Sequence, residues 1–394
     1  MSDHQTIFDA DNHYYEPRDA FTRYMDPRRR EAAIHVERGD DGEEVLYIGA
    51  KRFTFLEHRG FDVTIKPGSL RDFLRNMADD DYKHSDVYEP IQPHSLSRDA
   101  RLALMDEQRL DAILLFPTFG VCVEHFMKED VEQTYANLHA FNRWLDDDWG
   151  FDYEGRIFAV PLMSLLDLDR AVDELDWALS RGARVVHLRP GPAFGRSPAD
   201  PYFDPFWARL NEARVPVAFH IAESGYNEMM SVHYGEEANP ASHRQTAFQW
   251  TNFYGDRPIM DTISSLIFHN LFGRFPELRV LSVENGSLFA SYLMKVMDKM
   301  KGMGRNGPWL GGYVKGRPSE VFKRHVFISP YHEEDIVALS NEIGASQVLF
   351  GSDFPHAEGL AEPRGFEAEL EGLSSNEIRS IMGGNCSRLV SGRA

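Results

Sequence analysis

Short apolar runs rich in β-branched residues recur along the whole chain, and each is followed by polar or charged residues. Several are apolar without alternation, which is typical of parallel strands that are covered on both faces. There are eight of these runs, the number that a (β/α)8 or TIM barrel needs. They cover residues 7–11, 112–116, 156–160, 184–188, 215–220, 279–285, 325–329 and 347–353. We therefore predict an α/β fold, a distorted TIM barrel.

Segments with helical periodicity separate several of these runs. Apolar residues recur at helical spacing in residues 131–149 and again in 168–179. Gly182 supplies a stop signal after the second of these segments. The stretch from 156 to 188 is therefore predicted to be one complete β-α-β unit.

Two connections are too long for one crossover helix: about 100 residues after the first run and about 60 after the fifth. We predict insertions at about 18–96 and 224–265, after strands 1 and 5, on the face where barrel enzymes place their sites. Residues 43–55 predict a small hairpin, whereas the second insertion has little helical periodicity. Because no Pro/Gly/Ser linker divides the chain, we predict that residues 1–394 form one barrel domain.

Charge and composition exclude several classes of protein. The chain has 42 Lys and Arg against 62 Asp and Glu, a net charge of −20, which repels nucleic acids and anionic membranes. No run reaches the ~18 apolar residues of a membrane span, and the first residues do not resemble a signal peptide. Two Cys cannot form a disulfide framework. We expect a cytoplasmic protein with a small-molecule substrate and without nucleic acid or membrane partners.

Polar side chains stand where the predicted strands end. The first run ends with Asp11 and His13, which alternation places on the same side, and the fifth ends with His220. The sixth contains Glu284 and the eighth ends with Asp353. Each residue alone has a structural explanation, such as a helix cap, a satisfied core histidine or turn chemistry. At one barrel mouth, however, two His and two carboxylates suit a divalent metal, so we predict Asp11, His13, His220 and Asp353 as ligands.

Other polar residues are candidates for the same mouth. Arg189 follows the fourth run and could bind a substrate carboxylate, although a surface arginine at a turn is an equal alternative. His187 could line the pocket or belong to the core. Four residues are predicted to support the ligands or to hold a second metal: Glu223, His243, His356 and Glu284.

Five motifs together resemble the amidohydrolase-2 family. They are DADNHYYEP (9–17), PVAFHIAESG (216–225), FGRFPELRVLSVENG (272–286), VLFGSDFPHAEG (348–359) and IMGGNCSRL (381–389). That family belongs to the metal-dependent amidohydrolase superfamily and includes the aminocarboxymuconate-semialdehyde decarboxylase group. The resemblance implies a distorted TIM barrel with one catalytic divalent metal, usually zinc and sometimes manganese, iron or magnesium. It also implies a dimer.

The resemblance assigns ligand roles by position. Asp11 and His13 stand where these proteins have His-x-His or Glu-x-His, His220 is the fifth-strand ligand, and Asp353 is the eighth-strand aspartate. Asp11 departs from the pattern because its side chain is one methylene shorter than that of Glu. A second departure is Glu284, which stands where the decarboxylase branch has the histidine of a His-Gly-Gly run, and this weakens a transfer of decarboxylase activity.

The predicted function is metal-dependent hydrolysis of a small, carboxylated or aromatic substrate. A divalent metal lowers the pKa of a water molecule, and Asp353 would accept its proton, with Glu284 as a further acid or base. Alternatives are a metal-dependent non-oxidative decarboxylase, a dinuclear-metal oxygenase and a non-catalytic assembly subunit. We expect one divalent metal, zinc first with manganese or iron as alternatives, and leave a second metal open. The expected assembly is a homodimer or a complex with a related subunit.

Overall fold

Parallel strands form the centre of the protein. The structure, a computed structural model, describes residues 5–39, 42, 44–56, 61–76, 87–254 and 256–393. One parallel sheet has the order β1 (Phe8–Tyr14), β7 (Ala112–Pro117), β8 (Ile157–Ala159). A second has the order β12 (Val326–Ile328), β11 (Val280–Val283), β10 (Val217–His220), β9 (Val186–His187).

Isolated parallel bridges close these two sheets into a ring. The bridge between Leu162 and His187 joins the end of the β8 segment to β9. On the other side, Val348 bridges to Ile328 of β12, and Phe354 bridges to Asn12 of β1. The eighth predicted run therefore lies between β12 and β1, and the TIM barrel prediction is confirmed.

On the side that faces β1, a side chain interrupts the backbone pairing of the eighth run. The backbone N–H of Ser352 donates to Oδ1 of Asp9 at 2.9 Å instead of to a carbonyl of β1. On either side, Ala10 N–H donates to Phe350 O at 2.7 Å and Asp353 N–H donates to Asp11 O at 2.8 Å. The Asp9 carboxylate thus supplies part of the hydrogen bonding at the junction, or seam, between the first and eighth strands.

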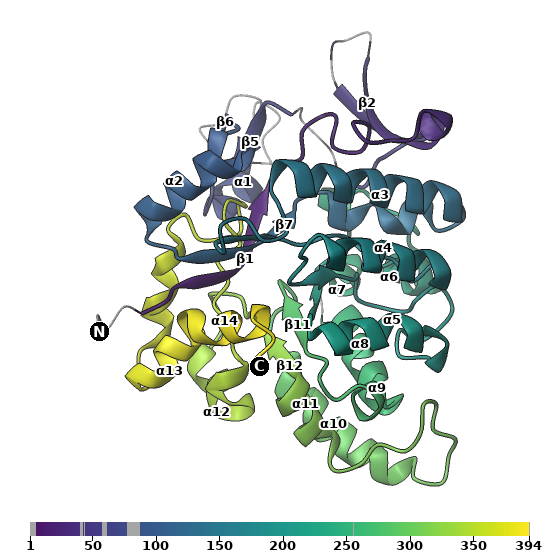
Figure 1. The fold of residues 1–394 in the computed structure, drawn as a ribbon, viewed down its shortest axis with the longest axis vertical. Coiled ribbons are helices and arrows are strands. Elements are labelled where there is room, and N and C mark those ends of the chain that lie inside the picture. Colours follow the sequence, from purple (N-terminus) through teal and green to yellow (C-terminus); the bar gives the residue numbers. More distant parts are fainter. Residues whose placement is uncertain are drawn as a thin grey trace.

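Helices surround the strands, as Figure 1 shows. The predicted helices over 131–149 and 168–179 are α3 (Val131–Asp148) and α4 (Leu168–Ser180), and Gly182, at φ +92°, follows α4. Each begins at an aspartate that accepts a backbone N–H of the first turn. The other helices after the strands are α5 (Asp204–Ala213), α8 (Arg257–Phe268), α9 (Leu271–Arg274), α10 (Phe289–Met303), α11 (Pro318–His325), α12 (Ile336–Ile343), α13 (Ser375–Arg379) and α14 (Asn385–Val390). Among the described residues, no helix combines the length and apolar character that crossing a membrane requires.

The first insertion carries two small antiparallel sheets. The predicted hairpin is present as β3 (Glu44–Ile48) and β4 (Lys51–Arg52), and β2 (Ile34–Arg38) pairs with β3. A two-stranded sheet follows, with β5 (Val63–Ile65) against β6 (Tyr88–Pro90). This part contains α1 (Leu70–Asn76), and α2 (Arg98–Gln108) follows it before β7.

The second insertion contains short helices that periodicity did not predict. They are α6 (Tyr226–Met230) and α7 (Ala247–Phe253). A capping box starts α7: Thr246 Oγ1 accepts Gln249 N–H at 3.2 Å, and Gln249 Oε1 accepts Thr246 N–H at 3.0 Å. Helices this short depend on their caps and tertiary contacts, which explains why the residues show no long apolar stripe.

Alternation along the strands separates an inner core from an outer one. On β7, Leu114 and Phe116 belong to the cluster inside the barrel, whereas Ile113 and Leu115 pack against the helices. On β1, Phe8 and Ala10 belong to the inner cluster. Simple alternation would then turn the next odd-numbered residues outward, but the β1–β7 register shifts between residues 9 and 12. This irregularity changes the face on which the strand presents its last residues.

Candidate metal centre

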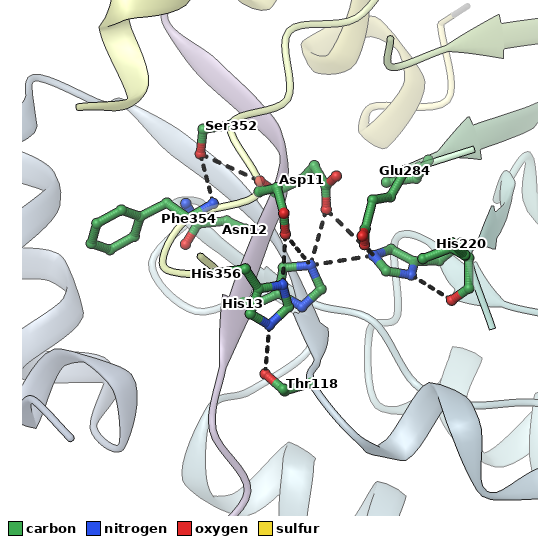
Figure 2. Close-up of polar contacts among 12 residues, drawn as sticks. Asp11, Asn12, His13, Thr118, His220, Glu284, Ser352, Phe354 and His356 are labelled. Carbon is green, nitrogen blue, oxygen red and sulfur yellow. Dashed lines mark hydrogen bonds and ion pairs between the residues drawn. The ribbon is translucent and has the colours of Figure 1, made fainter. Parts of the chain in front are cut away.

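Four predicted ligands and Glu284 meet at one end of the barrel, where Figure 2 shows Asp11, His13, His220 and Glu284. Nε2 of His13 lies 3.2 Å from Nε2 of His220 and 3.2 Å from Oδ1 of Asp11. Oδ1 of Asp353 is 3.3 Å from His13 Nε2, and Oε2 of Glu284 is 3.3 Å from His220 Nε2. All five side chains are buried. The register shift in β1 thus delivers Asp11 and His13 to the mouth.

Both imidazole rings turn Nε2 toward this centre. Nδ1 of His13 lies 3.2 Å from Pro117 O, and Nδ1 of His220 lies 2.9 Å from Ile221 O. Because a carbonyl oxygen only accepts, each Nδ1 carries a hydrogen, and in a neutral ring Nε2 then presents a lone pair. Burial lowers the pKa of His13 to about 3, so its ring is neutral. Two facing lone pairs repel each other, and a cation between them would remove that repulsion.

The carboxylates of the centre also call for positive charge. Burial raises the pKa of Glu284 well above its usual range, and the nearby Asp353 and Asp11 raise it further. Burial likewise raises the pKa of Asp353, with Glu358 and Asp11 as the next causes. A bound divalent cation would lower the pKa values of both carboxyl groups and favour their charged forms. Two imidazole nitrogens and several carboxylate oxygens therefore fit a divalent metal by donor type and by charge.

His356 connects this centre to the loop after β7. Its Nε2 lies 3.0 Å from Oγ1 of Thr118, whose hydroxyl donates to Tyr14 O at 2.7 Å, so the ring nitrogen must be the donor. Its Nδ1 lies 2.7 Å from Oδ1 of Asp353. Burial lowers the pKa of His356 and raises that of Asp353, so the proton between them belongs to the carboxyl group. His13, Glu284, Asp353 and His356 also form a second group whose ligand atoms lie within 4.8 Å of one another.

Two of the carboxylate residues at this centre have an unusual backbone conformation. Glu284 and Asp353 both have φ of +53°, in the left-handed region that non-glycine residues rarely occupy. Tyr331 donates its hydroxyl to Glu284 O at 2.9 Å, which fixes one of these positions. Such strain persists only where the surroundings enforce it, and it concentrates at functional sites.

A buried layer behind β1 holds the ligands in place, and the sequence did not reveal it. Oδ2 of Asp9 accepts from Asn12 Nδ2 at 2.9 Å and from Ser352 Oγ at 2.5 Å. Arg101 of α2 donates to Asn12 Oδ1 and, at 2.7 Å, to His13 O. Burial raises the pKa of Asp9 to about 7. In the sequence, only the alternating acidic residues of DADNH pointed to a role for Asp9. No sequence pattern pointed to Arg101.

A cavity of about 320 Å³ opens over the centre, lined in part by His13, His220, Glu284 and His356. Both insertions contribute residues to its walls. The first insertion supplies Leu56, Phe61, Val63, Thr64, Ile65, Phe73, Tyr88 and Ile91; the second supplies Ser242, Phe253 and Tyr254. The described lining residues include Glu16, Glu284 and Glu358 but no Lys or Arg.

The two predicted substrate-binding residues lie outside the described lining of this cavity. Nε of Arg189 is 3.2 Å from Oε2 of Glu124, and its other nitrogens donate to the carbonyls of Ser224 and Pro192. His187 is buried with its ring centroid 6.4 Å from that of His220. The guanidinium of Arg189 is thus already engaged by protein groups. Substrate binding by these residues stays a prediction.

Two further candidates also stay predictions. Glu223 is buried, its Oε1 accepts Gly225 N–H at 2.6 Å, and burial raises its pKa to about 7. It is not part of either ligand group found among the described residues. The side chain of His243 lies outside the described part of the structure.

Comparison with known proteins decides the family. The family model described as amidohydrolase matches residues 91–391. The chain belongs to the amidohydrolase family. The resemblance inferred from the motifs is confirmed, and the protein is an enzyme of the amidohydrolase superfamily. A search of curated proteins found no match.

Solved structures of related proteins cover almost the whole amidohydrolase chain. A crystal structure of an amidohydrolase from Mycobacterium avium subsp. paratuberculosis K-10 is 40% identical, with a TM-score of 0.87, covering 98% of this chain and 99% of that one. The 5-carboxyvanillate decarboxylase of Sphingomonas paucimobilis is 18% identical with a TM-score of 0.63, covering 98% and 99%. That of Novosphingobium aromaticivorans DSM 12444, complexed with manganese and 4-hydroxy-3-methoxy-5-nitrobenzoic acid, is 16% identical with a TM-score of 0.63, covering 98% and 96%.

Proposed function

We propose that this amidohydrolase is a metal-dependent hydrolase of a small aromatic ester, lactone or amide. The observation that carries the proposal is the contact between Asp353 and His356, at 2.7 Å, beside the two facing imidazoles. This contact supports Asp353 as the proton acceptor and His356 as the residue that relays its proton, next to the residues that would hold a metal.

Asp11, His13 and His220 would hold the metal, with Asp353 and Glu284 beside it. When bound, a divalent cation supplies a Lewis acid that polarises a carbonyl group and lowers the pKa of a water molecule. The charge of the cation would lower the pKa of Asp353 and ionise it, so that its carboxylate could accept the proton of the attacking water and return it to the leaving group. His356 holds Asp353 in position through Nδ1 and is itself held by Thr118.

The cavity favours hydrolysis of an uncharged carbonyl over binding of a carboxylate. Aromatic rings of Phe61, Phe73 and Phe253 contribute to its walls and suit an aromatic substrate. Its described charged side chains are carboxylates, which repel an anionic substrate. This supports the aromatic part of our prediction and opposes the carboxylated part.

Decarboxylation is the second candidate. Its support is the fold match over nearly the whole chain with two 5-carboxyvanillate decarboxylases. A decarboxylase needs an acid that protonates the carbon losing CO2, and Glu284, whose pKa is raised by burial, could supply that proton. Manganese, named with one of these decarboxylases, joins zinc as a metal to be tested. The single-domain organisation, the homodimer and the cytoplasmic location stay predictions.

The test combines metal analysis with a substrate panel. Purified protein is assayed for bound metals and then, loaded with Zn or Mn, against aryl esters, aryl lactones, anilides and hydroxybenzoates. We expect hydrolysis of an uncharged substrate, its loss in Asp353→Asn with metal retained, and loss of both metal and activity in His220→Ala. His233→Ala, at an exposed histidine, is the matched control. Release of CO2 without ester or amide hydrolysis would establish the decarboxylase instead.

A further inference from the structure

A second polar group lines the cavity, apart from the predicted ligands. Tyr254 donates its hydroxyl hydrogen to Oε1 of Glu358 at 3.0 Å. Glu358 follows the eighth strand, five residues after Asp353, and Tyr254 directly follows α7 in the second insertion. Both residues line the cavity. The pair therefore joins the barrel mouth to the insertion that covers it.

This pair presents only hydrogen-bond acceptors to a ligand. Tyr254 has one hydroxyl hydrogen, and it is used on Glu358, so its oxygen is left with lone pairs. A carboxylate accepts at both oxygens, and within the described residues Tyr254 is the only hydrogen-bond partner of Glu358. A ligand group that contacts the pair must therefore be a donor.

Charge in the cavity favours a positively charged donor. Glu358 lines the same cavity as His13 and Glu284, so its carboxylate lies in the same space as the metal centre. The cavity and the centre together hold four carboxyl groups, namely Asp11, Glu284, Asp353 and Glu358. The described lining of the cavity contains no Lys or Arg beside them. An ammonium group would find both a charged acceptor and an attractive field.

The walls around this pair are also suited to a cation. Phe253 precedes Tyr254, the rings of the two residues have centroids 5.2 Å apart, and both line the cavity. Phe61 contributes another ring from the first insertion. Aromatic faces attract ammonium groups through their quadrupoles, and the effect is stronger when the cation is desolvated.

We propose that Glu358, positioned by Tyr254, binds a protonated amine of the substrate and is the specificity-determining residue of the cavity. The substrate class is a small aromatic ester, lactone or amide that carries an amine away from the bond to be broken. The reaction in this statement rests on the proposed hydrolase function, whereas the binding of the amine does not.

A binding experiment tests the amine site without requiring turnover. Benzylamine, benzyl alcohol and benzoate are titrated into the metal-loaded protein by calorimetry. We expect benzylamine to bind more tightly than benzyl alcohol, and benzoate to bind most weakly. Glu358→Gln should weaken benzylamine on the order of ten-fold, the scale of one charged hydrogen bond, while benzyl alcohol changes by less than about two-fold.

The controls separate a local effect from a general one. Glu362→Gln removes the same charge from an exposed position four residues further along the chain and should leave all three affinities unchanged. Tyr254→Phe keeps the Glu358 charge but removes the donor that orients it, so benzylamine should weaken less than in Glu358→Gln. Circular dichroism and metal content confirm that each variant folds. Tightest binding of benzoate, or equal benzylamine binding by wild type and Glu358→Gln, would overturn the proposal.

A turnover experiment distinguishes this proposal from the hydrolase proposal. Phenyl esters that differ only in a distal aminomethyl or methyl group are compared by kcat/KM. Preference for the aminomethyl ester, lost in Glu358→Gln, supports both proposals. Hydrolysis of both esters at equal rates overturns the amine site alone. Tight benzylamine binding without hydrolysis of any ester overturns the hydrolase function and leaves the amine site standing.

Discussion

The pKa of Glu16 allows a quantitative test of how burial changes the ionisation of a carboxyl group in this cavity. Its carboxylate lines the cavity and accepts the backbone N–H groups of Phe119 at 3.1 Å and Gly120 at 2.8 Å. Burial nevertheless dominates and raises the pKa of Glu16 from 4.5 to about 7. Between these two pH values the folded protein keeps a proton that the unfolded chain has released. The contribution of Glu16 to the free energy of unfolding therefore falls as pH rises from 4.5 to about 7.

The expected size of this effect follows from linkage. At about 1.4 kcal/mol for each pH unit, the window from 4.5 to about 7 corresponds to about 3 kcal/mol. Glu16→Gln cannot titrate, so the difference in unfolding free energy between wild type and variant should fall by that amount from about pH 4.5 to 7.5. Denaturant unfolding of both proteins at several pH values measures it.

The Glu16→Gln substitution can also change the free energy of unfolding by an amount that does not depend on pH. Comparing the two proteins at several pH values cancels that amount. Glu362→Gln, at an exposed position, corrects for the general effect of removing one carboxylate. A wild-type advantage over Glu16→Gln that stays constant within about 0.5 kcal/mol across this range would refute the assignment of the raised pKa to Glu16.

Three further predictions concern the metal centre and its support. Arg101→Leu leaves Asn12 Oδ1 and His13 O without their buried donor, so it should cost about 2–5 kcal/mol in unfolding free energy by denaturant titration and weaken metal binding. Removing the metal by dialysis against a chelator should lower Tm, and restoring the metal should raise it by an amount that grows with metal concentration; an unchanged Tm would contradict the fit of the donor set. Thr118→Val removes the acceptor of His356 Nε2–H, so kcat should fall about ten-fold with metal content unchanged, and equal kcat would remove Thr118 from the relay.

The ring of strands and the positions of the ligands could be predicted because each depends on a local pattern. Every predicted apolar run lies at a strand position of the barrel, and parallel strands bring their carboxyl ends to one edge. Asp11, His13, His220, Glu284 and Asp353 were therefore recognisable before any contact was known. Alternation also placed Asp11 and His13 on one side correctly.

Other features depend on contacts that no local pattern records. The register shift between Asp9 and Asn12 decides which side of β1 faces the mouth, and alternation alone does not contain it. Tyr254 meets Glu358 across 104 residues, through an insertion whose short helices have no apolar stripe. Arg189 was selected for its fork-shaped donor group, but its partner Glu124 lies on a loop after a different strand.

The seam between the first and eighth strands has a consequence for the order of assembly. Asp11 and Asp353 face the same centre, although more than 340 residues separate these strands in sequence. Bringing such distant segments together carries a loop-closure entropy that only the finished ring offsets. A chain still under synthesis cannot present the full set of ligands until its last strand has emerged. The proposed metal would therefore meet its full set of ligands only after the last strand has joined the ring, late in the folding of the chain.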